Sequence, residues 1–105
     1  MINDDPPEIF YLVVIAGRKQ KDSILSALCK NGGHITNAFF GSAATKISNF
    51  MDLLGFVRER ENVIITCLTS SEEVDSIFSM LNNDFGFDKP KTGIAFTIPV
   101  EKLSY

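Results

Sequence analysis

The chain has 105 residues, of which 45% are hydrophobic and 22% charged, and its formal net charge is −3 at pH 7. This composition is typical of one soluble globular domain that is long enough to bury a core without disulfides or metals. A negative chain is not expected to neutralise nucleic-acid phosphates, and no apolar run approaches the ~20 residues of a membrane-spanning helix. The basic residues are mostly scattered, and Arg18, Lys19 and Lys21 form the only group of three within four positions.

The first forty residues predict a strand, a helix and a second strand. Residues 9–16 form an unbroken apolar run, which is typical of a buried strand. Apolar residues at helical spacing follow over 19–30, and Asn31-Gly32-Gly33 supplies a left-handed stop. Residues 34–41 mix apolar and polar side chains, as a less buried strand does.

Residues 42–61 form a connection that is long for two antiparallel neighbours. Within it, Ile47, Phe50, Met51 and Leu54 are spaced for a short helix. These apolar side chains are candidates for docking on a partner protein, and packing on the body of the domain is the alternative. The sequence leaves both readings open.

The remaining residues predict a strand, a helix and a closing strand. Residues 62–68 are nearly all apolar, and Ser70 with Glu73 makes a capping box that predicts a helix start. One stripe of this helix would carry Val74, Ile77, Phe78, Leu81 and Phe85. The last strand alternates over 93–100, and Pro99 is tolerated only if this strand lies at an edge of the sheet.

This order of elements predicts an α+β fold of the ferredoxin-like βαββαβ kind, with a four-stranded antiparallel sheet in the order 4-1-3-2. The two continuous apolar runs then become the central strands, and the mixed or alternating ones become the edges. Residues 1–8 are polar and contain two prolines, so we expect a disordered lead-in and a single domain over 9–105.

Both faces of the two central strands are apolar. In residues 9–16 and 62–68, each of the two alternating sets of side chains is largely hydrophobic. Two helices can cover only one face of the sheet, so the second face is expected to be buried in an oligomer. The alternative is that residues 42–61 fold back over it.

Few side chains predict catalysis or metal binding. His34 is the only histidine and opens an edge strand, so we expect it to be solvated. Cys29 and Cys67 are predicted to be small core residues rather than nucleophiles, and one histidine with two separated cysteines does not assemble a zinc site. Because so few side chains predict catalysis, we expect a protein without enzymatic activity. With no Cys-x-x-Cys pair and no secretory signal, we expect it in the reducing cytoplasm.

Two glycine segments resemble those of the nitrogen regulatory protein PII family. Lys91-Thr92-Gly93-Ile94-Ala95-Phe96 is similar to a Gly-x-Gly-x-x-Phe stretch, with Lys91 in place of the first glycine and Ile94 in place of a lysine. Phe39-Phe40-Gly41 is similar to the family's Gly-Phe-Gly. The resemblance implies a homotrimer that binds nucleotide between subunits. The ligand-binding residues that it implies are Phe40, Gly41, Ser42, Lys89, Lys91, Thr92 and Gly93.

This resemblance implies a regulatory protein that senses a small-molecule effector and signals to a target protein through residues 42–61. An adenine nucleotide is the expected effector, and no resident cofactor or metal is expected. Glycines that serve turn geometry alone are the alternative at the ligand site. The other functional hypotheses are a trimeric interaction module that binds no nucleotide and a CutA-like protein with the same kind of trimeric body.

Overall fold

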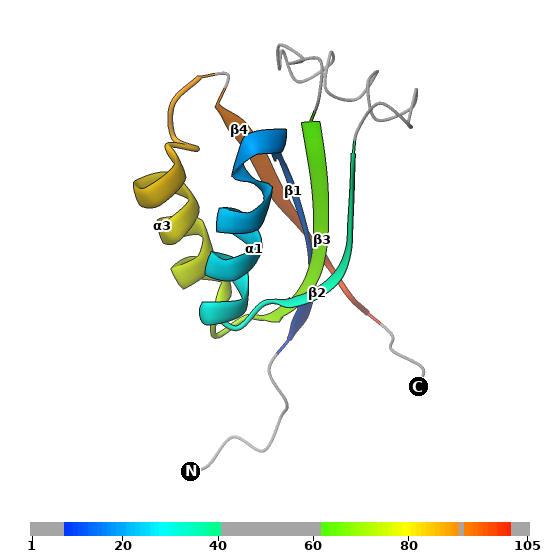
Figure 1. Cartoon of the computed structure of the whole chain (residues 1–105). Helices are drawn as coiled ribbons and strands as arrows, with labels where there is room; N and C mark the ends of the chain where they lie inside the picture. Colours follow the sequence, from blue (N-terminus) through cyan, green and yellow to red (C-terminus); the bar gives the residue numbers. More distant parts are fainter. Residues whose placement is uncertain (1–7, 41–61, 91, 102–105) are drawn as a thin grey trace.

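The computed structural model describes residues 8–40, 62–90 and 92–101. Two longer helices lie against one face of a four-stranded sheet (Figure 1). The elements in chain order are β1 (Ile9–Gly17), the 3-10 helix η1 (Arg18–Gln20), α1 (Lys21–Lys30), β2 (His34–Phe40), β3 (Asn62–Ser70), α3 (Val74–Phe85) and β4 (Gly93–Pro99). The predicted lead-in, apart from Glu8, and the predicted short helix within 42–61 lie outside the described residues.

The sheet confirms the predicted fold. Its strand order is β2-β3-β1-β4, which is the predicted order read from the opposite edge, and every neighbouring pair is antiparallel. The two unbroken apolar runs are the central strands, because a central strand needs burial on both faces. Pro99 lies in the edge strand β4, opposite Phe10, where a missing N–H on the outer side breaks no ladder bond.

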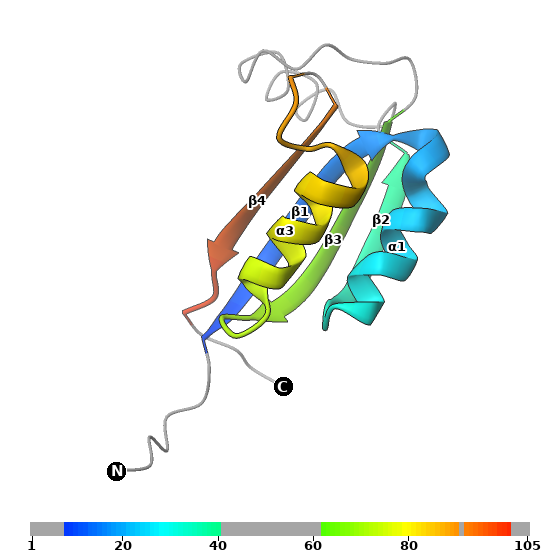
Figure 2. The same cartoon turned by 90° about the vertical axis from the view of Figure 1, so that its left-hand side faces the viewer.

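One face of the sheet packs against the helices and carries the main core. α1 lies toward the β2 edge and α3 toward the β4 edge (Figure 2). The strands place alternate apolar residues inward to meet the helices. The fully buried members of this core are Leu12, Val14, Ala16, Ile24, Leu28, Val63, Ile65, Cys67, Ile77 and Leu81.

The opposite face of the sheet, which we call the open face, has no described helix over it (Figure 1). It nevertheless carries large side chains from all four strands, and Ile15 and Ile64 form a second small cluster at one end, against which Val13, Phe39 and Ile94 pack. Its exposure rises along β4, where Ile98 is 50% exposed. From the pairing and the alternation, its members include Ile9, Tyr11, Val13, Ile15, Phe39, Ile64, Thr66, Leu68, Ile94, Phe96 and Ile98.

The start of α3 corrects one prediction. Ser70 still belongs to β3, and the residue before the helix is Glu73, which makes no side-chain capping bond. The turn is closed by the backbone instead, because the Glu73 N–H donates to the Ser70 carbonyl at 3.0 Å. The prediction that Ser70 and Glu73 form a capping box was therefore wrong.

The predicted left-handed stop after α1 is confirmed at Gly32, which has φ 88°. The carboxylate of Glu73 occupies the space where a side chain at this position would begin. Gly32 is thus required by its backbone conformation, whereas the flexible Glu73 side chain could move aside for a Cβ atom.

Of the two cysteine predictions, one is confirmed and the other is wrong. Cys67 is fully buried among the core residues of β3, as expected. Cys29 is exposed, so its prediction as a core residue was wrong. α1 buries only Ile24 and Leu28, a narrower stripe than its sequence suggested. His34 is exposed, as predicted.

Candidate functional site

The structure describes only part of the ligand site that the sequence predicts. Phe40 ends β2, and Gly93 opens β4 directly after Thr92. Lys89 lies in the turn between α3 and β4. Outside the described residues lie Gly41, Ser42 and Lys91, together with the predicted docking side chains Ile47, Phe50, Met51 and Leu54.

The two halves of the predicted site lie at the same end of the sheet but on opposite edges. Phe40 pairs with Val63, Val63 with Ala16, and Ala16 with Gly93. These four residues form one row across all four strands, so three strand spacings, ~14 Å, separate Phe40 from Gly93. Within one chain, the described residues of the two halves therefore do not come together.

The β4 half is shaped by the ring of Phe87. A Cβ placed on Gly93 would lie 2.5 Å from that ring, which is closer than any side chain can approach. The preceding turn is held by the Lys89 N–H, which donates to the Gly86 carbonyl at 2.9 Å. Gly93 is therefore needed for packing on the helix side, whatever it contributes to a ligand.

The β2 half contains a basic and aromatic cluster that the sequence analysis did not assign to the site. Phe40 is 39% exposed. The guanidinium carbon of Arg18 lies 4.5 Å from the centroid of its ring, and the ammonium of Lys21 lies 5.4 Å from it. The sequence showed that Arg18, Lys19 and Lys21 are clustered. Only the fold shows that Arg18 and Lys21 lie beside Phe40 at the end of β2.

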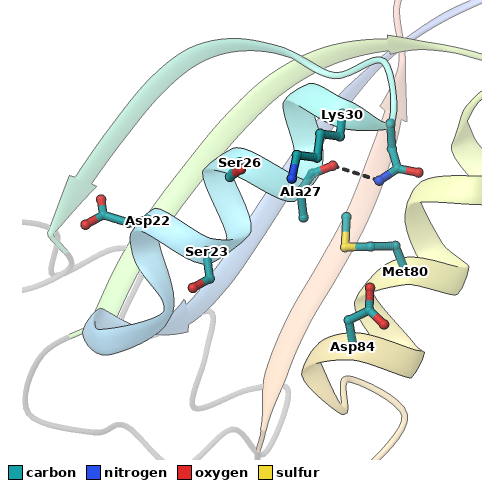
Figure 3. Close-up of a pocket in the computed structure, with 8 residues that line it drawn as sticks. Asp22, Ser23, Ser26, Ala27, Lys30, Met80 and Asp84 are labelled. Atoms are coloured by element: carbon teal, nitrogen blue, oxygen red, sulfur yellow. Dashed lines mark hydrogen bonds between the residues drawn. The ribbon is translucent and has the colours of Figure 1, made fainter.

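A separate groove of about 500 Å³ lies between α1 and α3 (Figure 3). Asn31 links the two helices beside this groove. Its side-chain amide donates to the Ala27 carbonyl of α1 at 2.8 Å, and its Oδ1 accepts from the Ser76 hydroxyl of α3 at 3.1 Å. None of the described residues of the predicted ligand site lines this groove. The described residues that line it are Asp22, Ser23, Ser26, Ala27, Lys30, Asn31, Met80 and Asp84.

The described residues offer little to covalent or metal chemistry. Burial, with a smaller contribution from the charge of Cys29, raises the pKa of the Cys67 thiol to about 11. Cys67 is therefore protonated at neutral pH and has no thiolate to act as a nucleophile. Within the described ranges, no group of three or more His, Cys, Asp or Glu side chains is placed to hold a metal ion.

Among the helices that the structure describes, none is long and apolar enough to cross a membrane. No protein-family model and no curated protein matches the chain.

Solved structures share the fold at low sequence identity. A Thermus thermophilus protein described as a PII-like signalling protein matches with a TM-score of 0.59 and 14% identity, over 90% of this chain and 88% of that one. CPII from Thiomonas intermedia K12, bound to ADP, AMP and acetate, matches with a TM-score of 0.58 and 14% identity, over 91% of both chains. The B. subtilis GlnK–ATP complex matches with a TM-score of 0.55 and 17% identity, over 90% of this chain and 85% of that one.

The chain therefore has the fold of PII-like signalling proteins over almost its whole length. This agrees with the fold that the two glycine segments implied.

Proposed function

We propose that the chain is a PII-like regulatory protein, without enzymatic activity, that works as a homotrimer and senses an adenine nucleotide between its subunits. The observation that carries this proposal is the placement of the predicted ligand residues. Phe40 and Gly93 stand on opposite edges of one sheet, at the same end. A small-molecule ligand can contact the residues at the end of β2 and those at the start of β4 together only where the β2 edge of one copy meets the β4 edge of another.

The open face supports the assembly. Ile98 is half exposed on it, and its neighbours Tyr11 and Val13 are only partly buried. Burying a large apolar side chain is worth roughly 1.5–3 kcal/mol, so covering this face with other copies is strongly favourable. The number of copies, three, follows from the resemblance to the PII family.

The nucleotide is proposed from the same resemblance and from the neighbours in structure. CPII is bound to ADP and AMP, and GlnK to ATP. In this chain, Phe40, Gly41 and Ser42 of one copy would face Lys89, Lys91, Thr92 and Gly93 of another. Residues 42–61 adjoin the first group and carry the signal to a target, provided that the ligand binds two states of this segment unequally.

Thermal unfolding with added nucleotides tests the sensor. ATP, ADP, AMP and cyclic AMP are added separately to the wild-type protein. A nucleotide at a hundred times its dissociation constant stabilises the folded state by about 2.7 kcal/mol per site, which raises the melting temperature measurably. If none of the four changes the melting temperature, the chain is not an adenine-nucleotide sensor.

Light scattering after size exclusion tests the assembly. We expect the mass of a trimer for the wild-type protein and a smaller mass for Ile98→Asp, which places a charge on the open face. Ser79→Asp adds the same charge to an exposed position of α3 and should leave the trimer intact. A wild-type protein that is monomeric at micromolar concentration would exclude the proposed assembly.

A trimeric interaction module without a nucleotide is the second candidate, and the Phe87 ring favours it. Because this ring already explains why residue 93 is a glycine, no ligand is needed to account for it. In this case, docking would depend on Ile47, Phe50, Met51 and Leu54. A trimer that shows no nucleotide response would support this candidate over the sensor.

A further inference from the structure

We propose that the outer edge of β4 binds an extended segment of a partner protein, which joins the sheet as a further strand. This docking surface goes beyond the proposed nucleotide sensing, because the residues that carry it, Ala95 and Thr97, are not among the predicted ligand residues. The occupant is an extended chain, since only a strand matches backbone groups that repeat at every second residue.

The backbone of β4 leaves a regular row of groups open on its outer side. The Val100 N–H donates to the Ile9 carbonyl at 2.9 Å, which fixes the residues that face β1. By the alternation of a strand, Ala95 and Thr97 then direct their N–H and C=O groups away from β1, and β4 has no other neighbour among the described strands. Within the described ranges, no donor or acceptor meets these outward groups. The register of β4 with β1 is also unbroken, so the open row is a regular ladder.

The opposite edge of the sheet is closed to such an addition. Two residues of β2, Thr36 and Asn37, stand opposite Thr66, and the Thr36 hydroxyl donates to the Thr66 carbonyl at 3.0 Å. This bulge places the outward groups of Ile35 and Ala38 three residues apart instead of two, so they do not match a regular strand. The Ala38 N–H is already bonded to the Asn37 Oδ1 at 2.8 Å. A bulge protects an edge from strand addition, and the described residues of β4 contain none.

Another copy of the sheet does not fit the β4 edge. In the proposed assembly, the β4 edge of one copy meets the β2 edge of the next, and the bulge keeps β2 from completing a regular ladder there. Two β4 edges do not face each other in a closed head-to-tail ring. The exclusion of a second copy therefore rests on the proposed assembly, whereas the open ladder of β4 does not. A segment of a different protein is the occupant that remains.

The side chains beside the edge select the sequence of this segment. Ile98 is 50% exposed on the open face, so the residues of the segment on that side should be apolar. On the helix side, β4 presents the smaller side chains of Ala95 and Thr97. Because paired residues lie on the same face, the helix-side residues of the segment direct their N–H groups at β4, and the open-face residues direct theirs away.

The test is an NMR titration of the full-length, isotope-labelled protein with a short capped peptide in which threonine and valine alternate between terminal lysines. With the valines on the open-face side, we expect the amide signals of Ala95 and Thr97 to shift and their hydrogen exchange to slow. N-methylation of the threonines removes the N–H groups that face β4 and should weaken binding by about tenfold or more. N-methylation of the valines is the matched control and should leave binding unchanged.

A pair of protein variants tests the same contact from the other side. Thr97→Pro removes an outward N–H and should weaken peptide binding about tenfold, whereas Thr97→Val retains this N–H and should bind as the wild type does. Pro99 already occupies a position of the same kind, so the strand tolerates proline where the N–H faces outward. Neither change alters a predicted ligand residue, so the response of the melting temperature to nucleotides should remain that of the wild type.

The outcomes separate this docking surface from the sensor. If the two N-methylated peptides bind equally, or if the unmodified peptide does not bind at millimolar concentration, strand addition at β4 is wrong and the sensor is unaffected. If the amides of Ala95 and Thr97 are protected without peptide, and more so as the protein concentration rises, a second copy occupies the edge and the partner segment is wrong. If the peptide binds as expected while no nucleotide changes the melting temperature, the docking surface stands and the sensor fails.

Discussion

The two faces of the sheet are built from equally apolar strands, yet only one of them is covered by described helices. On the helix-covered face, Leu12, Val14 and Ile65 are fully buried by α1 and α3. On the open face, burial is complete only around Ile15 and Ile64, and it falls to half at Ile98. The difference teaches that the helix-covered face is buried by the described part of the chain itself, whereas the open face keeps apolar side chains that the described residues leave partly exposed.

β4 makes this contrast sharpest. Its residues toward the helices are small or polar, namely Gly93, Ala95, Thr97 and Pro99. Its large residues, Ile94, Phe96 and Ile98, all lie on the open face. A strand whose outer face met water would show the reverse pattern, because large apolar side chains are placed where they are buried.

The largest expected effect comes from the same truncation on the two faces. Ile65→Ala removes a fully buried side chain from the main core and should lower the free energy of unfolding by about 2–5 kcal/mol. Ile98→Ala removes a half-exposed side chain and should cost less than about 1 kcal/mol at concentrations where the protein is monomeric. Urea unfolding followed by circular dichroism measures both.

Protein concentration then sharpens the contrast. The cost of Ile98→Ala should grow as the concentration rises into the range where copies associate, because stability then includes the interface. The cost of Ile65→Ala should change much less with concentration. Equal costs for the two variants at low concentration would contradict the division of roles between the faces.

The second prediction concerns the small residues of β4 on the helix side. Gly93→Ala places a methyl group against the Phe87 ring and should destabilise the protein by about 1–3 kcal/mol. Phe87→Ala removes the ring and is costly by itself, but it also removes the clash. In the double variant, Gly93→Ala should therefore cost little more than Phe87→Ala alone, as urea unfolding of all four proteins would show.

Additive costs in this double-mutant cycle would show that the ring does not determine the glycine. The same cycle separates packing from ligand binding. If Gly93→Ala in the Phe87→Ala background has normal stability relative to its parent but loses nucleotide response, the glycine serves the ligand as well.

The sequence was sufficient to predict the fold because its clearest local patterns also determine where each strand can lie in the sheet. Unbroken apolar runs can be buried on both faces only at the centre of a sheet, and Pro99 restricts its strand to an edge. The start of α3 was misjudged because Ser70 fits a capping motif as well as it fits the end of β3. Local chemistry could not decide between the two, and strand pairing with Ile9 did.

The candidate site was less predictable because it depends on residues that the fold brings together. Arg18 and Phe40 are far apart in sequence and meet only because the chain returns through α1 and β2 to the same end of the sheet. The sequence identified the glycine segment before β4, but it could not show that the ring of Phe87 packs against Gly93. By contrast, the position of Phe40 and Gly93 on opposite edges follows from the predicted strand order, and the structure confirms it.

The smallest expected effect is a pH dependence that belongs to the helix-covered face alone. Burial, and to a lesser extent the charge of Cys29, raises the pKa of Cys67 from its ordinary value of 9.0 to about 11. Above pH 9 the unfolded chain therefore loses this proton while the folded chain keeps it, so stability falls as the pH rises toward 11 and is unaffected well below pH 9. Cys67→Val should remove this part of the decline in urea unfolding between about pH 8 and pH 11, because valine fills the site without an ionisable group.

Cys29→Ser is the matched control for this pH dependence, because it changes an exposed thiol on α1. It should keep most of the decline, since burial rather than the neighbouring charge is the larger cause of the raised pKa. A wild-type decline that persists unchanged in Cys67→Val would mean that other groups titrate there, and that the helix-covered face is more accessible to water than its fully buried side chains indicate.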